Sequence, residues 1–212
     1  MQVEIPCQRS VLMGDLNIPS QAIGFIIFVH GSGSSRKSPR NQSVASHLNH
    51  LGFATLLFDL LTEAEELNRQ NVFDIKLLSL RLNEVKRWAT ENEHLSKLSI
   101  GYFGASTGAA AALVSASMLD SEISAVVSRG GRVDLAGEFL ESVKTPVLMI
   151  VGAEDKEVLE LNYDAKRHLH CENKIEIIPG ATHLFEEPGA LDLVADLAGD
   201  WFLHHLNNLA EK

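Results

Sequence analysis

Residues 98–112 read LSIGYFGASTGAAAA, and this stretch decides the fold. An apolar run, Leu98 to Phe103, leads into the pattern G-x-S-x-G, and small residues then open a helix. The pattern predicts a sharp turn from a strand into a helix, with Ser106 in a strained conformation and Gly104 and Gly108 avoiding clashes. A serine presented in this way is typical of an acyl-transfer nucleophile. An ordinary strand-to-helix turn is the alternative.

An acid and a histidine are expected to follow the serine in chain order, each in a loop after a strand. Asp155 follows the apolar run Val147 to Val151, and there it would accept a hydrogen bond from the histidine and fix its tautomer. Glu154 is the nearest competitor for this role, and Asp134 is a third candidate. Either carboxylate of the 154–155 pair could instead be a charge at the N-terminus of the next helix.

His183 is the expected general base. It belongs to the irregular loop PGATH, residues 179–183, which follows the last apolar run, Ile175 to Ile178. Most of the eight other histidines are expected on the surface or in helices. For His183 itself, a loop position without a catalytic role is the alternative.

An oxyanion formed at Ser106 would need hydrogen-bond donors from two places. The helix after the serine directs free N–H groups at it, so the backbone N–H of Thr107 is one expected donor. The loop HGSGS, residues 30–34, follows the apolar run Ile23 to Val29 and should supply the other. The backbone N–H of Ser32 is the candidate, with Gly33 as the alternative and as a residue close to the substrate. A tight turn without this role is also possible for the loop.

Short apolar runs alternate with helical patterns from about residue 23 onward, which indicates βαβ units and a mainly parallel sheet, an α/β fold. An opening hairpin, Val3 to Ile5 with Val11 to Asn17, should form an antiparallel edge. The core strands are expected to be buried on both faces. They span Ile23 to Val29, Ala54 to Phe58, Leu98 to Phe103, Ala125 to Val127, Val147 to Val151 and Ile175 to Ile178. The expected helices span Val44 to Leu51, Phe73 to Glu91, Gly108 to Leu119, Val158 to His168 and Leu191 to Leu209.

The composition of the 212 residues, 45% hydrophobic and 22% charged, predicts a single domain spanning residues 1–212. A net charge of −10 argues against nucleic acid and anionic lipid as partners. The first residues lack a secretory signal and the apolar runs are too short to cross a bilayer, so a cytoplasmic protein is expected. Cys7 and Cys171 predict neither a disulfide framework nor a zinc site. The charged patch Glu63 to Arg69 is expected to be a solvated loop or a helix end.

With these segments in order, the chain resembles the dienelactone hydrolase-like branch of the α/β-hydrolases over nearly its whole length. The resemblance rests on HGSGSS at 30–35 with SPRN at 38–41, on GYFGASTG at 101–108 and on HLFEEPG at 183–189. It implies an α/β-hydrolase fold with helices on both faces of the sheet, no cap domain and an open site. Dienelactone hydrolases proper are similar but use a cysteine nucleophile. Ser106 therefore favours simple carboxylic esters, cleaved through an acyl-enzyme without a metal or other cofactor.

The substrate is less narrowly indicated than the chemistry. Arg129 and Arg132, after the run Ala125 to Val127, and also Arg40, are candidates to bind a substrate carboxylate, although an arginine can equally tie down a loop. The same triad could act on a lactone, a thioester or a peptide-like amide, because the pocket decides the substrate. A non-catalytic binding protein of this fold should lack part of the triad, and every member is present here. We expect a small-molecule ester as the partner and a monomer or homodimer as the assembly.

Overall fold

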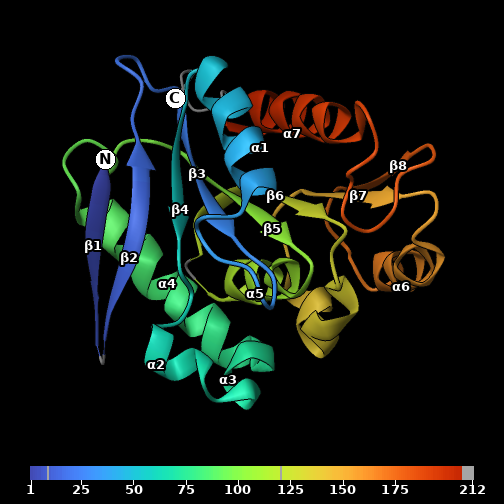
Figure 1. The fold of residues 1–212 in the computed structure, drawn as a ribbon, viewed down its shortest axis with the longest axis horizontal. Helices are drawn as coiled ribbons and strands as arrows, with labels where there is room; N and C mark the ends of the chain where they lie inside the picture. Colours follow the sequence, from blue (N-terminus) through green and yellow to red (C-terminus); the bar gives the residue numbers. More distant parts are fainter. Residues whose placement is uncertain (9, 120, 207–212) are drawn as a thin grey trace.

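The computed structural model describes residues 1–8, 10–119 and 121–206, and its strands form one sheet flanked by helices (Figure 1). The strand order is β1-β2-β4-β3-β5-β6-β7-β8. The strands are β1 (Gln2–Cys7), β2 (Ser10–Asn17), β3 (Gly24–Val29), β4 (Phe53–Phe58), β5 (Ile100–Ala105), β6 (Ile123–Arg129), β7 (Val147–Gly152) and β8 (Asn173–Ile178). β1 and β2 form an antiparallel hairpin, β2 runs antiparallel to β4, and the remaining neighbours are parallel. The predicted fold class and edge hairpin are confirmed.

Two strands differ from the sequence-based expectation in a way that matters for the site. β5 starts later than predicted and runs to Ala105, the residue directly before Ser106. β8 is the last strand of the sheet, and of its residues only Ile178 is buried, while Ile177 is 38% exposed. Burial on both faces was therefore a wrong expectation for β8, because an edge strand has a neighbour on one side only.

The five predicted helices are present as α1 (Pro39–His50), α4 (Ile75–Glu91), α5 (Thr107–Ser117), α6 (Lys156–Lys166) and α7 (Ala190–Leu206). α1 begins five residues earlier than expected, because Pro39 suits the first turn and the Ser38 side chain accepts the N–H of Asn41. Residues 207–209, predicted to extend the last helix, lie outside the described residues. No helix in the described part of the chain is both long and apolar enough to cross a membrane.

Three short helical segments were not predicted as helices. α2 (Glu63–Glu66) lies in the charged patch Glu63 to Arg69, which was expected to be a loop or helix end, and α3 (Arg69–Phe73) begins at the last residue of that patch. A 3-10 segment, η1 (Val133–Ser142), follows β6 and is interrupted at Gly137. α2 is stabilised by a capping box between Thr62 and Glu65. α2 and α3, with four and five residues, are too short to show a hydrophobic period, so the sequence pattern could not predict them.

The core is divided by the sheet into two layers (Figure 1). α1 and α7 cover one face, where Phe28, Phe103 and Phe202 are fully buried. α4, α5 and η1 cover the other face, and alanines of α5 allow that helix to lie close to the strands. Because the parallel strands point the same way, the loops after β3, β5, β6, β7 and β8 meet at one edge of the sheet. Every candidate site residue lies in or next to these loops.

Candidate active site

Ser106 lies at the turn between β5 and α5, with φ 50° and ψ −124°. A positive φ is strained for a residue other than glycine, so neighbouring groups must hold the turn. The Ser106 N–H donates to the carbonyl oxygen of Arg129 (3.3 Å), and the Ser106 carbonyl oxygen accepts the N–H of Arg132 (3.0 Å). The loop after β6 therefore fixes the strained turn from both sides.

Two glycines permit the close packing around this turn. A Cβ atom at Gly108 would lie 2.1 Å from the carbonyl oxygen of Val29, so any side chain there would push α5 away from β3. A Cβ atom at Gly31 would lie 2.9 Å from the Cβ atom of Ser106. The loop after β3 consequently lies directly against the candidate nucleophile.

Asp155 and His183 meet across the loops after β7 and β8. The Nδ1 atom of His183 and the Oδ2 atom of Asp155 are 2.6 Å apart, and the side chains are 39% and 14% exposed. The competing carboxylates are placed elsewhere: Glu154 is exposed, and Asp134 accepts two hydrogen bonds from Arg132 (2.9 and 2.8 Å). Among the residues that the structure describes, no three His, Cys, Asp or Glu side chains are grouped so as to hold a metal ion.

His183 also packs against the segment that holds Ser106. A Cβ atom at Gly130 would lie 3.3 Å from the His183 carbonyl oxygen and 3.5 Å from its Cε1 atom. The residue before Gly130 is Arg129, whose carbonyl oxygen accepts the Ser106 N–H. The structure thus gathers Ser106, His183 and Asp155 at the same edge of the sheet, as the sequence order predicted.

The loop after β3 turns sharply beside Ser106. Its Ser34 N–H donates to the carbonyl oxygen of Gly31 (3.2 Å), and Gly33 has a φ of 68°. The backbone N–H of Ser32, expected to be a free oxyanion donor, instead donates to Oγ1 of Thr107 at 2.9 Å. Thr107 is buried and begins α5. A side-chain hydroxyl therefore connects the two segments that were expected to supply donors.

His30 fixes the position of this loop through two hydrogen bonds, a role that was not predicted from the sequence. Its Nε2 atom accepts the backbone N–H of Leu60 (3.1 Å), so its Nδ1–H is assigned as the donor to the Gly31 carbonyl oxygen (3.0 Å). Burial lowers the pKa of His30, which keeps the ring neutral. Its place directly before Gly31, at the end of β3, is the only signal in the sequence that could have pointed to this role.

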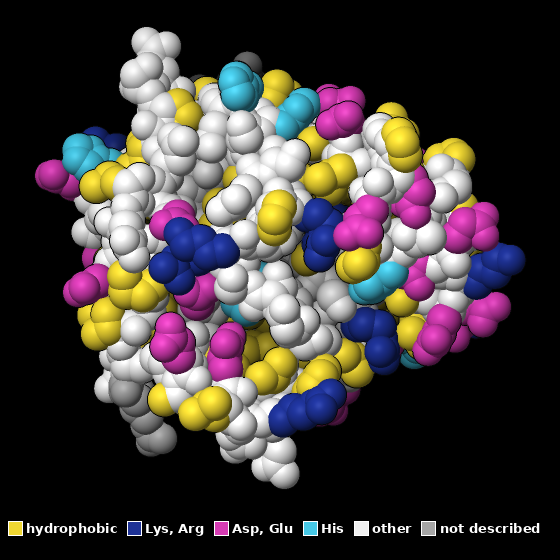
Figure 2. Space-filling view, in the orientation of Figure 1, with side chains coloured by type: hydrophobic (Ala, Val, Ile, Leu, Met, Phe, Trp, Pro, Cys, Tyr) yellow, Lys and Arg dark blue, Asp and Glu magenta, His cyan; other side chains and the backbone are white. Residues whose placement is uncertain are grey.

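A cavity of about 620 Å³ opens beside this loop. Its walls come from the loop after β3, the segment after β4, the short helices α2 and α3, and the first turn of α4. The lining residues are His30, Gly31, Ser32, Gly33, Ser34, Ser35, Leu60, Leu61, Glu66, Arg69, Val72, Phe73 and Leu78. Figure 2 shows hydrophobic side chains between acidic and basic ones on this face of the molecule. Gly31 contributes to the cavity wall and contacts Ser106, so the cavity begins next to the candidate nucleophile.

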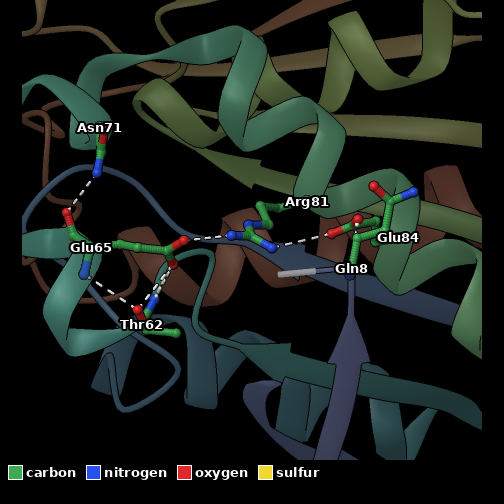
Figure 3. Close-up of polar contacts among 6 residues, drawn as sticks. All are labelled: Gln8, Thr62, Glu65, Asn71, Arg81 and Glu84. Atoms are coloured by element: carbon green, nitrogen blue, oxygen red, sulfur yellow. Dashed lines mark hydrogen bonds and ion pairs between the residues drawn. The ribbon is translucent and has the colours of Figure 1, made fainter. Parts of the chain in front are cut away.

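A partly buried ion pair anchors α2 and α3 to the body of the protein (Figure 3). Arg81 of α4, 7% exposed, donates to the carboxylates of Glu65 and Glu84. Glu65 also accepts the Thr62 N–H at 2.9 Å, and its carbonyl oxygen accepts from the Asn71 side chain at 2.9 Å. One glutamate therefore links α2, α3 and α4 and so holds one wall of the cavity.

The three candidate arginines differ in their partners. Arg132 forms a bidentate pair with Asp134, and Nη1 of Arg40 lies 3.1 Å from a carboxylate oxygen of Glu186. Arg129 is 8% exposed, and its Nη1 has no hydrogen-bond partner among the described residues. Burial lowers the pKa of Arg129 to about 10, and the charge of Arg40 acts in the same direction. Arg129 is thus the candidate for which the described residues supply no carboxylate partner.

Comparison with known proteins shows which family and which solved structures this chain resembles. A model of the dienelactone hydrolase family matches residues 13–206. The crystal structure of a dienelactone hydrolase from Anabaena variabilis has 50% sequence identity, covers 97% of both chains and has a TM-score of 0.94. Est1E from Butyrivibrio proteoclasticus, at 18% identity, TM-score 0.82 and coverage of 96% of this chain and 98% of its own, shares the fold.

Two proteins of Mycobacterium tuberculosis are similar over most of this chain and bear a different name. Each is called "Putative phosphoribosyl transferase" and is 53% identical over 205 residues, which are 97% of this chain and 46% of the relative. The chain therefore spans about half the length of these curated relatives.

Proposed function

Because the chain belongs to the dienelactone hydrolase family, whose members share a hydrolase fold, we propose that this hydrolase cleaves carboxylic esters with Ser106 as its nucleophile. The hydrogen bond of 2.6 Å between Asp155 and His183 carries the proposal. A carboxylate at Nδ1 leaves Nε2 as the basic nitrogen of the ring, which is what a general base for a serine requires. The strained turn at Ser106 supports the same assignment.

In the proposed reaction, Nε2 of His183 removes the hydroxyl proton of Ser106 as Oγ bonds to the ester carbon. Asp155 stabilises the imidazolium that results and remains ionised. The imidazolium then gives the proton to the departing alcohol oxygen, which leaves an acyl group on Ser106. A water molecule, deprotonated by His183 in the same way, releases the carboxylic acid and restores the serine.

The negative charge on the carbonyl oxygen is proposed to develop at the N-terminus of α5. The backbone N–H of Thr107 lies in the first turn of that helix, where no carbonyl of the helix can accept it. Preorganised donors of this kind lower the barrier of acyl transfer because they need no reorganisation during the reaction. The loop containing Ser32 and Gly33 lies against the same turn, because the Ser32 N–H donates to Oγ1 of Thr107.

The cavity beside Gly31 is proposed to hold one side of the ester. Leu60, Leu61, Val72 and Phe73 give it apolar walls, and its volume lies in the range of ordinary small-molecule sites. Apolar walls favour an acyl or alcohol group larger than acetyl. A lactone or thioester would follow the same steps at Ser106, so these two substrate classes are the alternatives.

Arg129 is the proposed contact for an acidic group on the substrate, because a buried guanidinium without a carboxylate partner is costly on its own. Arg132 is proposed to fix the loop after β6 through its two hydrogen bonds to Asp134. Arg40 is proposed to add a second positive charge near Arg129 for the same acidic group. Replacing Arg129 by methionine should then raise KM for an ester that bears a carboxylate and leave KM for its neutral analogue unchanged.

The name of the two longer relatives does not conflict with this proposal. The matched half of each shares 53% of its residues with this chain. This chain matches 46% of each relative, so the name was given to proteins about twice as long as this chain.

The test is hydrolysis of p-nitrophenyl esters from acetate to decanoate, together with a lactone and a thioester, by wild type and Ser106→Ala. We expect ester turnover that falls by more than about 10³-fold in the variant, because the serine, base and acid act as a unit. Turnover that does not depend on Ser106 would overturn the mechanism. Turnover of the lactone or thioester alone would overturn the ester assignment, and no turnover with a bound ester would favour a binding protein.

A further inference from the structure

The hydroxyl of Thr107 has one hydrogen bond where it can form more. It accepts the backbone N–H of Ser32 at 2.9 Å, and its own proton has no acceptor among the described residues. A threonine hydroxyl offers one donor and two acceptor positions. Thr107 is only 5% exposed, so an unused donor at this position is an incomplete hydrogen-bonding site.

The position of this hydroxyl is set by the residues on either side. Thr107 directly follows Ser106, and its Oγ1 atom is separated from its own backbone nitrogen by three bonds. In a gauche arrangement about Cα–Cβ, both atoms can donate to one oxygen placed next to Ser106. On the other side stands Ser32, next in the chain to Gly31, where an added Cβ atom would lie 2.9 Å from the Cβ atom of Ser106. The hydroxyl thus lies between the loop after β3 and the nucleophile turn.

We propose that the Thr107 hydroxyl is the second oxyanion donor, and that the Ser32 N–H supports this hydroxyl from behind instead of binding the oxyanion itself. The inference rests on the proposed serine-hydrolase function. Accepting the Ser32 N–H polarises the Thr107 O–H and strengthens it as a donor. It also fixes the rotamer of the threonine, so that no reorganisation is needed when charge develops.

The step involves no net proton transfer at Thr107. As Ser106 Oγ bonds to the ester carbon, the carbonyl π electrons move to oxygen, and that oxygen accepts both the N–H and the O–H of Thr107. When the alcohol leaves with the proton from His183, the C=O double bond re-forms and both bonds to Thr107 weaken. The threonine keeps its proton throughout.

Three variants of Thr107 and one remote control test the proposal. Thr107→Val preserves the shape but removes the hydroxyl, and Thr107→Ser keeps the hydroxyl. Thr145→Val is matched, because Thr145 is also buried and its hydroxyl makes one hydrogen bond to a backbone group, the Ile123 carbonyl oxygen at 3.1 Å. Thr107→Ala, which removes hydroxyl and methyl together, shows whether any loss follows the oxygen or the packing.

We expect kcat for p-nitrophenyl butyrate to fall by about 10²–10³-fold in Thr107→Val, the usual effect of losing one oxyanion donor. KM should stay within a few-fold, and affinity for a trifluoromethyl ketone, which forms a tetrahedral oxyanion on the serine, should fall in parallel with kcat. Thr107→Ser should retain activity within about tenfold, and Thr145→Val should match wild type. Thr107→Ala should lose as much as Thr107→Val.

Retention of kcat in Thr107→Val would overturn the inference, because that variant frees the Ser32 N–H to bind the oxyanion directly. An equal loss in Thr107→Ser would also overturn it, since the hydroxyl is still present. A wild-type protein without Ser106-dependent hydrolysis would instead overturn the proposed function, so the two failures are distinguishable. Melting temperatures of the variants identify any loss of activity that comes from unfolding.

Discussion

Asp155 and His183, after β7 and β8, meet through one hydrogen bond between side chains, whereas the loop after β3 reaches Ser106 with backbone groups held by buried side chains. At the Asp155–His183 pair, here called the base side, function depends on the chemical groups themselves, a carboxylate and an imidazole. At the loop after β3, here called the oxyanion side, function depends on the absence of a side chain at Gly31 and on the hydrogen bonds of His30 and Thr107. A change of one chemical group should therefore reduce activity most at the base side. A change in packing should reduce activity most at the oxyanion side.

The largest effect is expected from Asp155→Asn. The amide leaves the packing almost unchanged but favours the wrong tautomer of His183, so kcat for esters should fall by roughly 10³–10⁴-fold. Stopped-flow or steady-state hydrolysis of p-nitrophenyl esters measures it. Glu154→Gln is the matched control, because Glu154 is exposed and one residue away. Equal losses in both variants would mean that the base side is not built on a single carboxylate.

Gly31→Ala should break the other side through fit alone. The added Cβ atom would lie 2.9 Å from Ser106 Cβ and 3.0 Å from the Ala105 carbonyl oxygen, so the loop or the nucleophile turn must shift. A displacement of this kind should reduce kcat on the order of 10²-fold. Gly137→Ala is the control: a Cβ atom there meets nothing within 4 Å, so it should affect stability only. Full activity of Gly31→Ala would show that the oxyanion side tolerates movement.

The buried His30, which belongs to the oxyanion side, should make the stability of the protein depend on pH. His30 is neutral when folded because burial lowers its pKa, while its ordinary value is 6.5. Below that value the unfolded chain binds a proton that the folded chain does not, so the free energy of unfolding should fall as pH drops through 6.5. Urea unfolding between about pH 7.5 and 5 measures this, and His30→Asn should flatten that part of the profile. An unchanged profile in the variant would place the dependence on another group.

The smallest effect is expected from Glu65→Gln, which weakens the pair with Arg81 but keeps the shape. It should lower stability by about 1–3 kcal/mol, since Arg81 loses a charged partner. KM for long-chain esters should change a few-fold while KM for the acetate stays constant, because only the cavity wall is affected. A change confined to kcat would instead connect α2 and α3 to the chemistry.

The sequence predicted the base side better than the oxyanion side, and the reason is physical. Strand ends are visible as apolar runs, so Ser106, Asp155 and His183 could be placed after β5, β7 and β8 by order along the chain. The bond from Ser32 to Thr107 joins residues 75 positions apart, and the cavity walls come from separate segments between residues 30 and 78. No local pattern encodes such contacts, α2 and α3 are too short to show the periodicity that predicts longer helices, and η1 is interrupted at Gly137.

The short helices α2 and α3 are attached to the outside of the domain. None of their residues is buried, although Glu66, Arg69, Val72 and Phe73 line the cavity. Under the proposed function, substitutions of these four lining residues should change which substrates bind without disturbing the core or the triad, because the sheet carries those separately. In evolutionary terms, the cavity-lining positions of residues 63–73, as distinct from the anchor Glu65, are the part of this chain where selection would change substrate range at little cost to folding.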